Sequence, residues 1–146
     1  MEKRLMEITT VWSKINGYYN QWVQDQGIKS FQAQILLALL VDSDMTQKEI
    51  SEKYQMPKQS VNNIIHALLE EGLVHLEQSA QDNRKKIVVL TDAGQKYAEK
   101  VVKPFEDLDT QVFACMGKRS LQHLLDGLMA YEAALRKVVQ KKVNEH

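Results

Sequence analysis

The stretch TQKEISEKYQMPKQSVNNIIHALLEEGLV, residues 46–74, decides the fold. Thr46 and Glu49 have the spacing of a capping box, in which each side chain satisfies the backbone N–H of the other residue. A short helix therefore begins here, and Pro57 ends it while suiting the first turn of a second helix. Gly72 stands at the left-handed position that closes this second helix. Two helices separated by so tight a turn form a helix-turn-helix.

The second helix, predicted over residues 57–71, has one apolar and one polar face. The apolar face consists of Val61, Ile64, Ile65, Leu68 and Leu69. The outward face consists of Lys58, Gln59, Ser60, Asn62, Asn63 and His66. Amide side chains can pair with both hydrogen-bonding groups of an adenine edge, and serine pairs with a donor or an acceptor. This face predicts contact with DNA bases, whereas the simpler alternative is a solvated surface without a ligand.

The charge around this helix is locally positive in a chain that is neutral as a whole. Nineteen basic residues balance nineteen acidic ones. Between residues 53 and 69 there are two lysines, Lys53 and Lys58, and no acidic residue, so the local charge is +2. A nucleic-acid surface must therefore be a local patch rather than a general property of the chain.

A β-hairpin follows the helix-turn-helix, because the apolar period changes to two after Gly72. Residues 73–77 and 87–90 are predicted strands, and the polar loop between them ends in three consecutive cations. Arg84 is expected to enter a DNA minor groove. Lys85 and Lys86 are expected to hold phosphates, and Asp82 to brace the loop or the arginine. The alternative is that these cations only keep the loop solvated. A helix-turn-helix with such a hairpin is a winged helix.

The remaining helices carry more apolar surface than one winged helix can cover. A helix from Ser30, its expected N-cap, to Val41 is apolar almost all round and is the predicted centre of the core. The unassigned apolar stripes lie in residues 1–29 and 100–146. Exposed surface of this size indicates a partner, and a symmetric homodimer is the simplest one. We therefore expect one mainly α domain, 1–146, with a small β-hairpin wing, a DNA-binding lobe at 30–99 and dimerisation helices on either side.

Several functional classes are excluded or disfavoured by the sequence. The longest apolar run, residues 35–41, falls far short of the roughly 20 residues of a membrane span. The single cysteine of the chain, Cys115, cannot form an internal disulfide, and we expect a cytoplasmic protein. No phosphate-binding glycine loop, metal-ligand cluster or nucleophile motif occurs, so an enzyme is not expected. A winged helix that docks onto a protein is the alternative function, but its outward helix face lacks aromatic anchors.

Two strings resemble the MarR family of bacterial transcriptional regulators. Residues 82–84 (DNR) and 90–94 (LTDAG) are similar to the D-x-R…L-T-x-x-G signature of that family. Residues 60–74 are similar to its recognition helix. The resemblance implies a dimeric winged-helix regulator of a pseudo-palindromic operator, often a repressor and often released by a small ligand or an oxidant. Leu76 departs from the family, whose members commonly carry arginine there, so backbone binding is expected to depend more on Lys85 and Lys86.

Three further features bear on regulation. Cys115 is expected to be a buried packing residue rather than an oxidant sensor, because no basic residue follows it until Lys118 and reactive thiolates need positive charge nearby. The histidines are scattered, so neither a metal site nor another cofactor is predicted. They are His66, His75, His123 and His146. Trp12, Tyr19 and Trp22 are either packing residues or the wall of a site for a small aromatic or phenolic effector.

Overall fold

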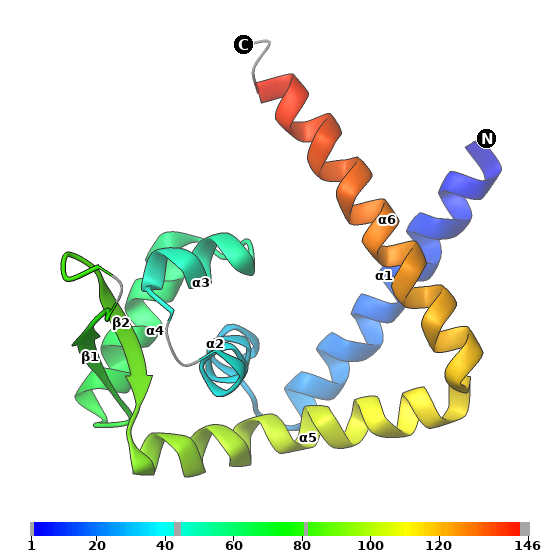
Figure 1. Ribbon diagram of the computed structural model, residues 1–146. Helices are drawn as coiled ribbons and strands as arrows, with labels where there is room; N and C mark the ends of the chain where they lie inside the picture. Colours follow the sequence, from blue (N-terminus) through cyan, green and yellow to red (C-terminus); the bar gives the residue numbers. More distant parts are fainter. Residues whose placement is uncertain (1, 43–44, 81, 144–146) are drawn as a thin grey trace. The chain divides into compact units, whose positions relative to one another are not determined.

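The computed structural model describes residues 2–42, 45–80 and 82–143 and is mainly helical (Figure 1). The elements in order are α1 (Glu2–Asp25), α2 (Ser30–Val41), α3 (Gln47–Lys53), α4 (Lys58–Glu70), β1 (Val74–Gln78), β2 (Lys86–Leu90), α5 (Asp92–Met116) and α6 (Lys118–Val143). The expected class, helices with a small β-hairpin, is confirmed. The chain divides into two compact units, residues 1–103 and residues 104–146.

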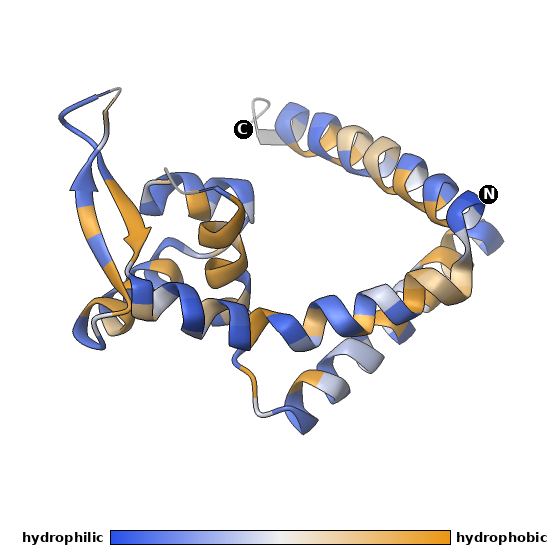
Figure 2. Ribbon diagram, turned by 60° about the horizontal axis from the view of Figure 1, so that its bottom comes forward, coloured by the Kyte–Doolittle hydropathy of each residue, from blue (hydrophilic) through white to orange (hydrophobic). Residues whose placement is uncertain are grey.

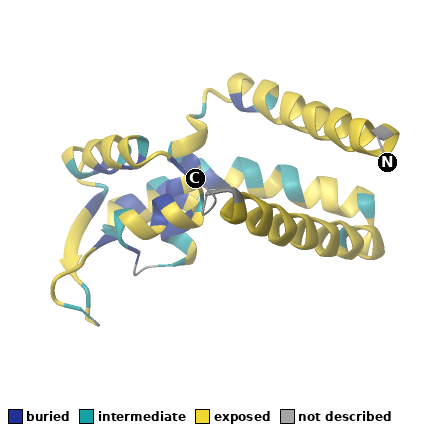
Figure 3. Cartoon of the chain, turned by 90° about the horizontal axis from the view of Figure 1, so that it is seen from above, coloured by how far each residue is buried: buried dark blue, intermediate teal, exposed yellow. Residues whose placement is uncertain are grey.

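Helix α2 is the centre of the core in the first unit, as its apolar composition predicted. Ile35, Leu36 and Ala38 are fully buried. They belong to one cluster with buried side chains of α3, α4, β2 and α5. Figure 3 shows that the buried positions of the chain gather in one region of the first unit. The burial is not all round, since Phe31 and Val41 are exposed.

The predicted N-cap of α2 is wrong by one residue. Lys29, not Ser30, has the extended backbone of a capping position, and its carbonyl accepts the first helical hydrogen bond from Ala33 at 3.0 Å. Ser30 is therefore already inside the helix, where its hydroxyl cannot cap the first turn.

Local hydrogen bonds fix the start of α3 and the turn from α3 into α4. The capping box is confirmed: the Thr46 N–H donates to Glu49 Oε2 at 2.8 Å, and the Glu49 N–H donates to Thr46 Oγ1 at 3.1 Å. Gln55 has a φ of 51°, in the left-handed region that a non-glycine residue rarely adopts. The buried Ser51 hydroxyl donates to the Met56 carbonyl at 2.7 Å. The backbone of Gln55 and the bond from Ser51 to Met56 turn the chain sharply into α4.

A glycine closes α4 as predicted. Gly72 has a φ of 69°, and its N–H donates to the Leu69 carbonyl at 3.0 Å. The Leu73 N–H donates to the Leu68 carbonyl at 2.9 Å. This pair of bonds is a Schellman motif, which satisfies carbonyls that the end of a helix leaves open. The chain then enters the antiparallel hairpin, in which Val74 pairs with Leu90 and Gln78 with Lys86.

Thr91 joins the base of the hairpin to the next helix. Its hydroxyl donates to the Gly72 carbonyl at 2.8 Å and accepts from the Gly94 N–H at 3.0 Å. Its own N–H donates to the Leu73 carbonyl at 3.0 Å. One side chain therefore caps α5 and ties that cap to the end of α4.

The two terminal helices expose apolar side chains within their own units. On α1 the exposed set includes Leu5, Ile8, Val11, Trp12 and Ile15. On α6 it includes Leu124, Leu125, Leu128, Leu135, Val138 and Val139. Figure 2 shows apolar positions recurring along α6. Among the described residues, no helix is both long enough and apolar enough to cross a membrane.

The close approach at Gly94 gives a stability prediction. A Cβ added there would lie 1.7 Å from the Leu73 carbonyl oxygen, which already accepts the Thr91 N–H. Gly94→Ala should therefore lower the free energy of unfolding by roughly 1–3 kcal/mol or more, because backbone must move. Urea denaturation followed by circular dichroism measures the change.

Gly17→Ala is the matched control, since an added Cβ meets nothing within 4 Å in the middle of α1. It should raise the free energy of unfolding by about 0.5–1 kcal/mol through lower backbone entropy of the unfolded chain. Equal effects of the two substitutions would contradict a special constraint at Gly94.

Candidate nucleic-acid interface

Helix α4 separates a buried apolar face from an exposed polar one. Val61 is 1% exposed, and Ile65 and Leu68 are 0% exposed. The predicted outward residues Lys58, Gln59, Asn62, Asn63 and His66 are exposed, and Ser60 is half-buried. The sequence-predicted face therefore exists as one surface on one helix, with Ser60 at its margin.

Two residues of this face, Gln59 and Asn63, are hydrogen-bonded to each other, and a third, His66, lies close to Glu70. Gln59 Nε2 donates to Asn63 Oδ1 at 2.8 Å. His66 Nδ1 lies 3.5 Å from Glu70 Oε1. Both pairs are four residues apart, a spacing that places side chains next to each other on a helix. The spacing of each pair is readable in the sequence and is the signal that predicts the contact.

The local charge differs from the +2 counted along the sequence. Lys53 Nζ donates to the Asp42 carboxylate, and this hydrogen bond raises the pKa of Lys53. Asp42 precedes the stretch that was counted, so the prediction overlooked the acid that compensates Lys53. Lys58, at the first position of α4, is the lysine that remains on the outward face.

The N-terminus of α4 is open, in contrast to that of α3. Pro57 is the N-cap and makes no side-chain capping bond, and the first turn contains no acidic residue. The first N–H groups of a helix have no partner within the helix and carry positive partial charge. In α3 the Thr46 hydroxyl accepts the N–H of Glu49, and the Glu49 carboxylate accepts the N–H of Thr46. No such side chain caps α4, so its first N–H groups are available to an anion.

The loop of the wing is braced by Asp82 through backbone groups. Asp82 Oδ1 accepts from the Arg84 N–H at 3.0 Å, and the Asp82 carbonyl accepts from the Lys85 N–H at 2.9 Å. The carboxylate thus holds the turn at the backbone of Arg84. The Arg84 side chain is exposed. Gln81, also in this loop, lies outside the described residues.

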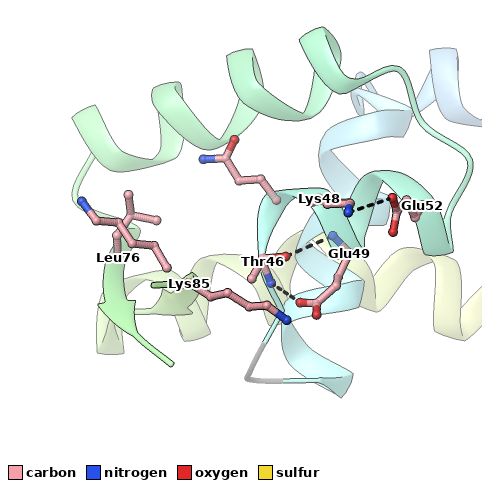
Figure 4. Close-up of a pocket in the computed structure, with 8 residues that line it drawn as sticks. Thr46, Lys48, Glu49, Glu52, Leu76 and Lys85 are labelled. Atoms are coloured by element: carbon pink, nitrogen blue, oxygen red, sulfur yellow. Dashed lines mark hydrogen bonds and ion pairs between the residues drawn. The ribbon is translucent and has the colours of Figure 1, made fainter. Parts of the chain in front are cut away.

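A cleft separates the wing from the start of α3 (Figure 4). Its volume is about 430 Å³, and it is lined by Thr46, Gln47, Lys48, Glu49, Glu52, Leu76, Lys85 and Lys86. Two of the expected phosphate ligands, Lys85 and Lys86, thus lie beside acidic residues that are distant in sequence. Leu76, where family members commonly carry arginine, is 38% exposed at the same cleft.

The pKa of Glu49, an acidic residue that lines this cleft, lies below its ordinary value. The backbone and then the side chain of Thr46 lower the pKa of Glu49 through hydrogen bonds, and the charges of Lys85 and Lys48 lower it further. Lys48 also lies 3.7 Å from Glu52. Glu49 therefore stays ionised, caps α3 and partly balances the charge of Lys85.

The remaining candidate residues lie on other helices. Trp12 is 53% exposed, Tyr19 is also exposed, and Trp22 is partly buried, all on α1.

Cys115 is exposed, so its expected burial is wrong; its neighbour Phe113 is itself exposed and does not enclose it. The described residues contain no group of three or more potential metal-ligating side chains. His146 lies outside the described residues.

The helix-turn-helix, its hairpin and the polar face of α4 define a winged helix-turn-helix protein. A model of the MarR family matches residues 26–85. The uncharacterized HTH-type transcriptional regulator YwoH of Bacillus subtilis (strain 168) is 30% identical over 114 residues, covering 70% of this chain and 82% of YwoH.

Solved structures agree with this likeness. The MarR family regulator NMB1585 from Neisseria meningitidis has a TM-score of 0.80 at 27% identity, covering 95% of this chain and 98% of that one. MepR of Staphylococcus aureus, solved in a complex with DNA, has a TM-score of 0.66 at 20% identity, covering 88% of this chain and 94% of MepR, and this likeness shows the fold. The chain belongs to the MarR family and is a DNA-binding transcriptional regulator.

The cleft gives a prediction for the titration of Glu49. Lys85→Met should raise the pKa of Glu49 toward its ordinary value, because a nearby positive charge is removed. The native pKa is lowered, so the carboxylate stabilises the fold above the ordinary pKa of a glutamate. This contribution is lost as the pH falls through the lower native value. Carbon-detected NMR titration of the Glu49 carboxyl measures the shift.

Lys86→Met is the matched control, because Lys86 lines the same cleft without being among the charges that lower the pKa of Glu49. An equal rise in both variants would contradict a specific interaction between Lys85 and Glu49.

Proposed function

We propose that two copies of this chain bind a pseudo-palindromic operator, each with α4 in a major groove, and repress transcription. The observation that carries the proposal is the exposed polar face of α4, fixed by the buried residues behind it. A major groove admits a helix and presents a distinct pattern of donors and acceptors for each base pair. The amides of Gln59, Asn62 and Asn63 supply matching groups, with Lys58, Ser60 and His66 around them.

Phosphate contacts come from α4 and from the wing. The open first turn of α4 and Lys58 attract a phosphate at the edge of the groove. Arg84 enters the adjacent minor groove, whose negative potential favours arginine. Lys85 and Lys86 hold backbone phosphates, which position a protein without specifying sequence. The hydrogen bond from Arg84 N–H to Asp82 supports this arrangement, because it orders the loop that presents the arginine.

The terminal helices support dimerisation. Leu128, at 41% exposed, lies in the middle of the apolar face of α6, and α1 has a similar exposed face. We propose residues 1–29 and 100–146 as the dimerisation helices around a lobe at 30–99. A two-fold dimer presents two copies of α4, so the operator repeats as an inverted sequence.

The proposed effector is a small aromatic or phenolic molecule. Trp12, Tyr19 and Trp22 share one face of α1, and aromatic walls suit flat organic ligands. We propose no catalytic step, metal or cofactor. As a regulator of DNA the protein would act in the cytoplasm. Docking onto another protein is disfavoured because the outward face of α4, which is described throughout, offers polar side chains and no aromatic anchor.

Selection of binding sites from a random duplex DNA pool tests the proposal. Purified protein at near-physiological salt should enrich an inverted repeat whose half-site centres lie about one helical turn apart. Weak binding that enriches no sequence would contradict operator recognition.

Leu128→Asp tests the dimer in the same experiment. A charge in the apolar face should give a monomer by light scattering and should remove the paired half-sites from the enriched sequences. Ala133→Asp places the same charge on the opposite, exposed side of α6 and should preserve both. A dimer in Leu128→Asp would exclude this face from the interface.

Arg84→Ala tests the wing. Loss of one phosphate-neutralising charge should weaken binding to most sequences and reduce the slope of log K against log salt by about one unit. Asn83→Ala, its uncharged neighbour in the loop, should leave the slope unchanged. A normal slope in Arg84→Ala would remove this residue from the interface.

A further inference from the structure

The hydrogen bond between Gln59 and Asn63 restricts what the outward face of α4 can recognise. Gln59 Nε2 donates to Asn63 Oδ1 at 2.8 Å, one helical turn along α4. Both side chains are exposed. The bond therefore forms on the surface that would meet DNA, before DNA is bound, and it engages one particular hydrogen-bonding group of each amide.

The groups that remain on Gln59 are one acceptor and one donor. Its amide has one oxygen and two N–H groups, and Asn63 takes one N–H. Oε1 and the second N–H stay available side by side. Adenine presents a matching donor and acceptor in the major groove, N6–H and N7, whereas guanine presents two acceptors, O6 and N7. An amide whose oxygen faces the base meets guanine oxygen against oxygen.

Asn63 determines which way the Gln59 amide faces. A Gln59 side chain without a partner can turn its oxygen or its nitrogen toward either group of a base. While Asn63 Oδ1 accepts from Gln59, the nitrogen is held toward Asn63 and Oε1 keeps its acceptor role. The bond is weak in water, but its effect increases when DNA excludes water from the face.

We propose that Asn63 is a positioning residue that holds Gln59 in the orientation recognising adenine and rejecting guanine, at one position of each half-site. The proposal rests on the proposed function, since it places α4 in the major groove of an operator. It separates the roles of neighbouring amides: Gln59 contacts the base, and Asn63 orients Gln59. Asn62 is not part of the pair.

The experiment is binding-site selection with the full-length protein and four single variants. The wild type should enrich adenine at a position where Gln59→Ala loses the preference. Asn63→Ala should weaken the preference at that same position, although Gln59 is still present. Asn63→Asp, whose carboxylate can accept the Gln59 N–H, should keep adenine while lowering affinity for all sequences through its charge. Asn83→Ala, the matched control, removes an amide from the wing loop instead of α4 and should keep adenine there.

Direct binding to the selected operator and to its adenine-to-guanine variant quantifies the effect. The wild type should discriminate by roughly 5- to 150-fold, the range of one good bidentate pair. This ratio of affinities should fall toward one in Gln59→Ala. The double variant Gln59→Ala with Asn63→Ala should discriminate between adenine and guanine no less than Gln59→Ala alone. Thermal melting by circular dichroism verifies that each variant is folded.

Three results would overturn the proposal. Full adenine preference in Asn63→Ala would show that Asn63 does not orient Gln59. If the wild type selects guanine at the position whose preference disappears in Gln59→Ala, the hydrogen bond runs in the reverse direction, with Asn63 as the donor. A wild type that selects an operator with no position dependent on Gln59 would exclude the contact. By contrast, a wild type that selects no operator at all would refute the proposed function itself, and this proposal with it.

Discussion

The rotation of α4 about its own axis is the constraint on which the DNA-binding surface depends. Val61, Ile65 and Leu68 are buried against the core around α2. Burial of such side chains is worth roughly 1.5–3 kcal/mol each, so the three together contribute about 5–9 kcal/mol. Turning the helix by one residue, about 100°, would expose part of this set. The amides on the other face therefore point outward because the opposite orientation is too costly.

The N-terminus of α3 is capped by side chains, whereas that of α4, a few residues later, has no side-chain cap. Thr46 and Glu49 close the start of α3 with reciprocal hydrogen bonds, and this keeps a negative charge at the cleft beside the wing. Pro57 leaves the start of α4 open, so positive partial charge is concentrated on the helix proposed to meet DNA. The contrast directs an anion toward α4, in a protein whose net charge is zero.

The base of the wing is held by backbone groups and by the hydroxyl of Thr91. Thr91 binds the Gly72 and Leu73 carbonyls and caps α5, while Gly94 lets the Leu73 carbonyl approach α5 closely. The end of α4, the base of the hairpin and the start of α5 are thus held at one point.

The sequence by itself determined the features that arise from neighbouring residues. The capping box at Thr46, the closure of α4 at Gly72 and the two faces of α4 follow from spacing along a helix, and all three were predicted. Only the tertiary structure decided that Asp42 compensates Lys53, that Lys85 lies near Glu49, and that Cys115 is exposed. These depend on which distant segments meet, because packing brings charges together irrespective of their separation in the chain. Periodicity can state which side of a helix faces inward, but it carries no information on what lies opposite.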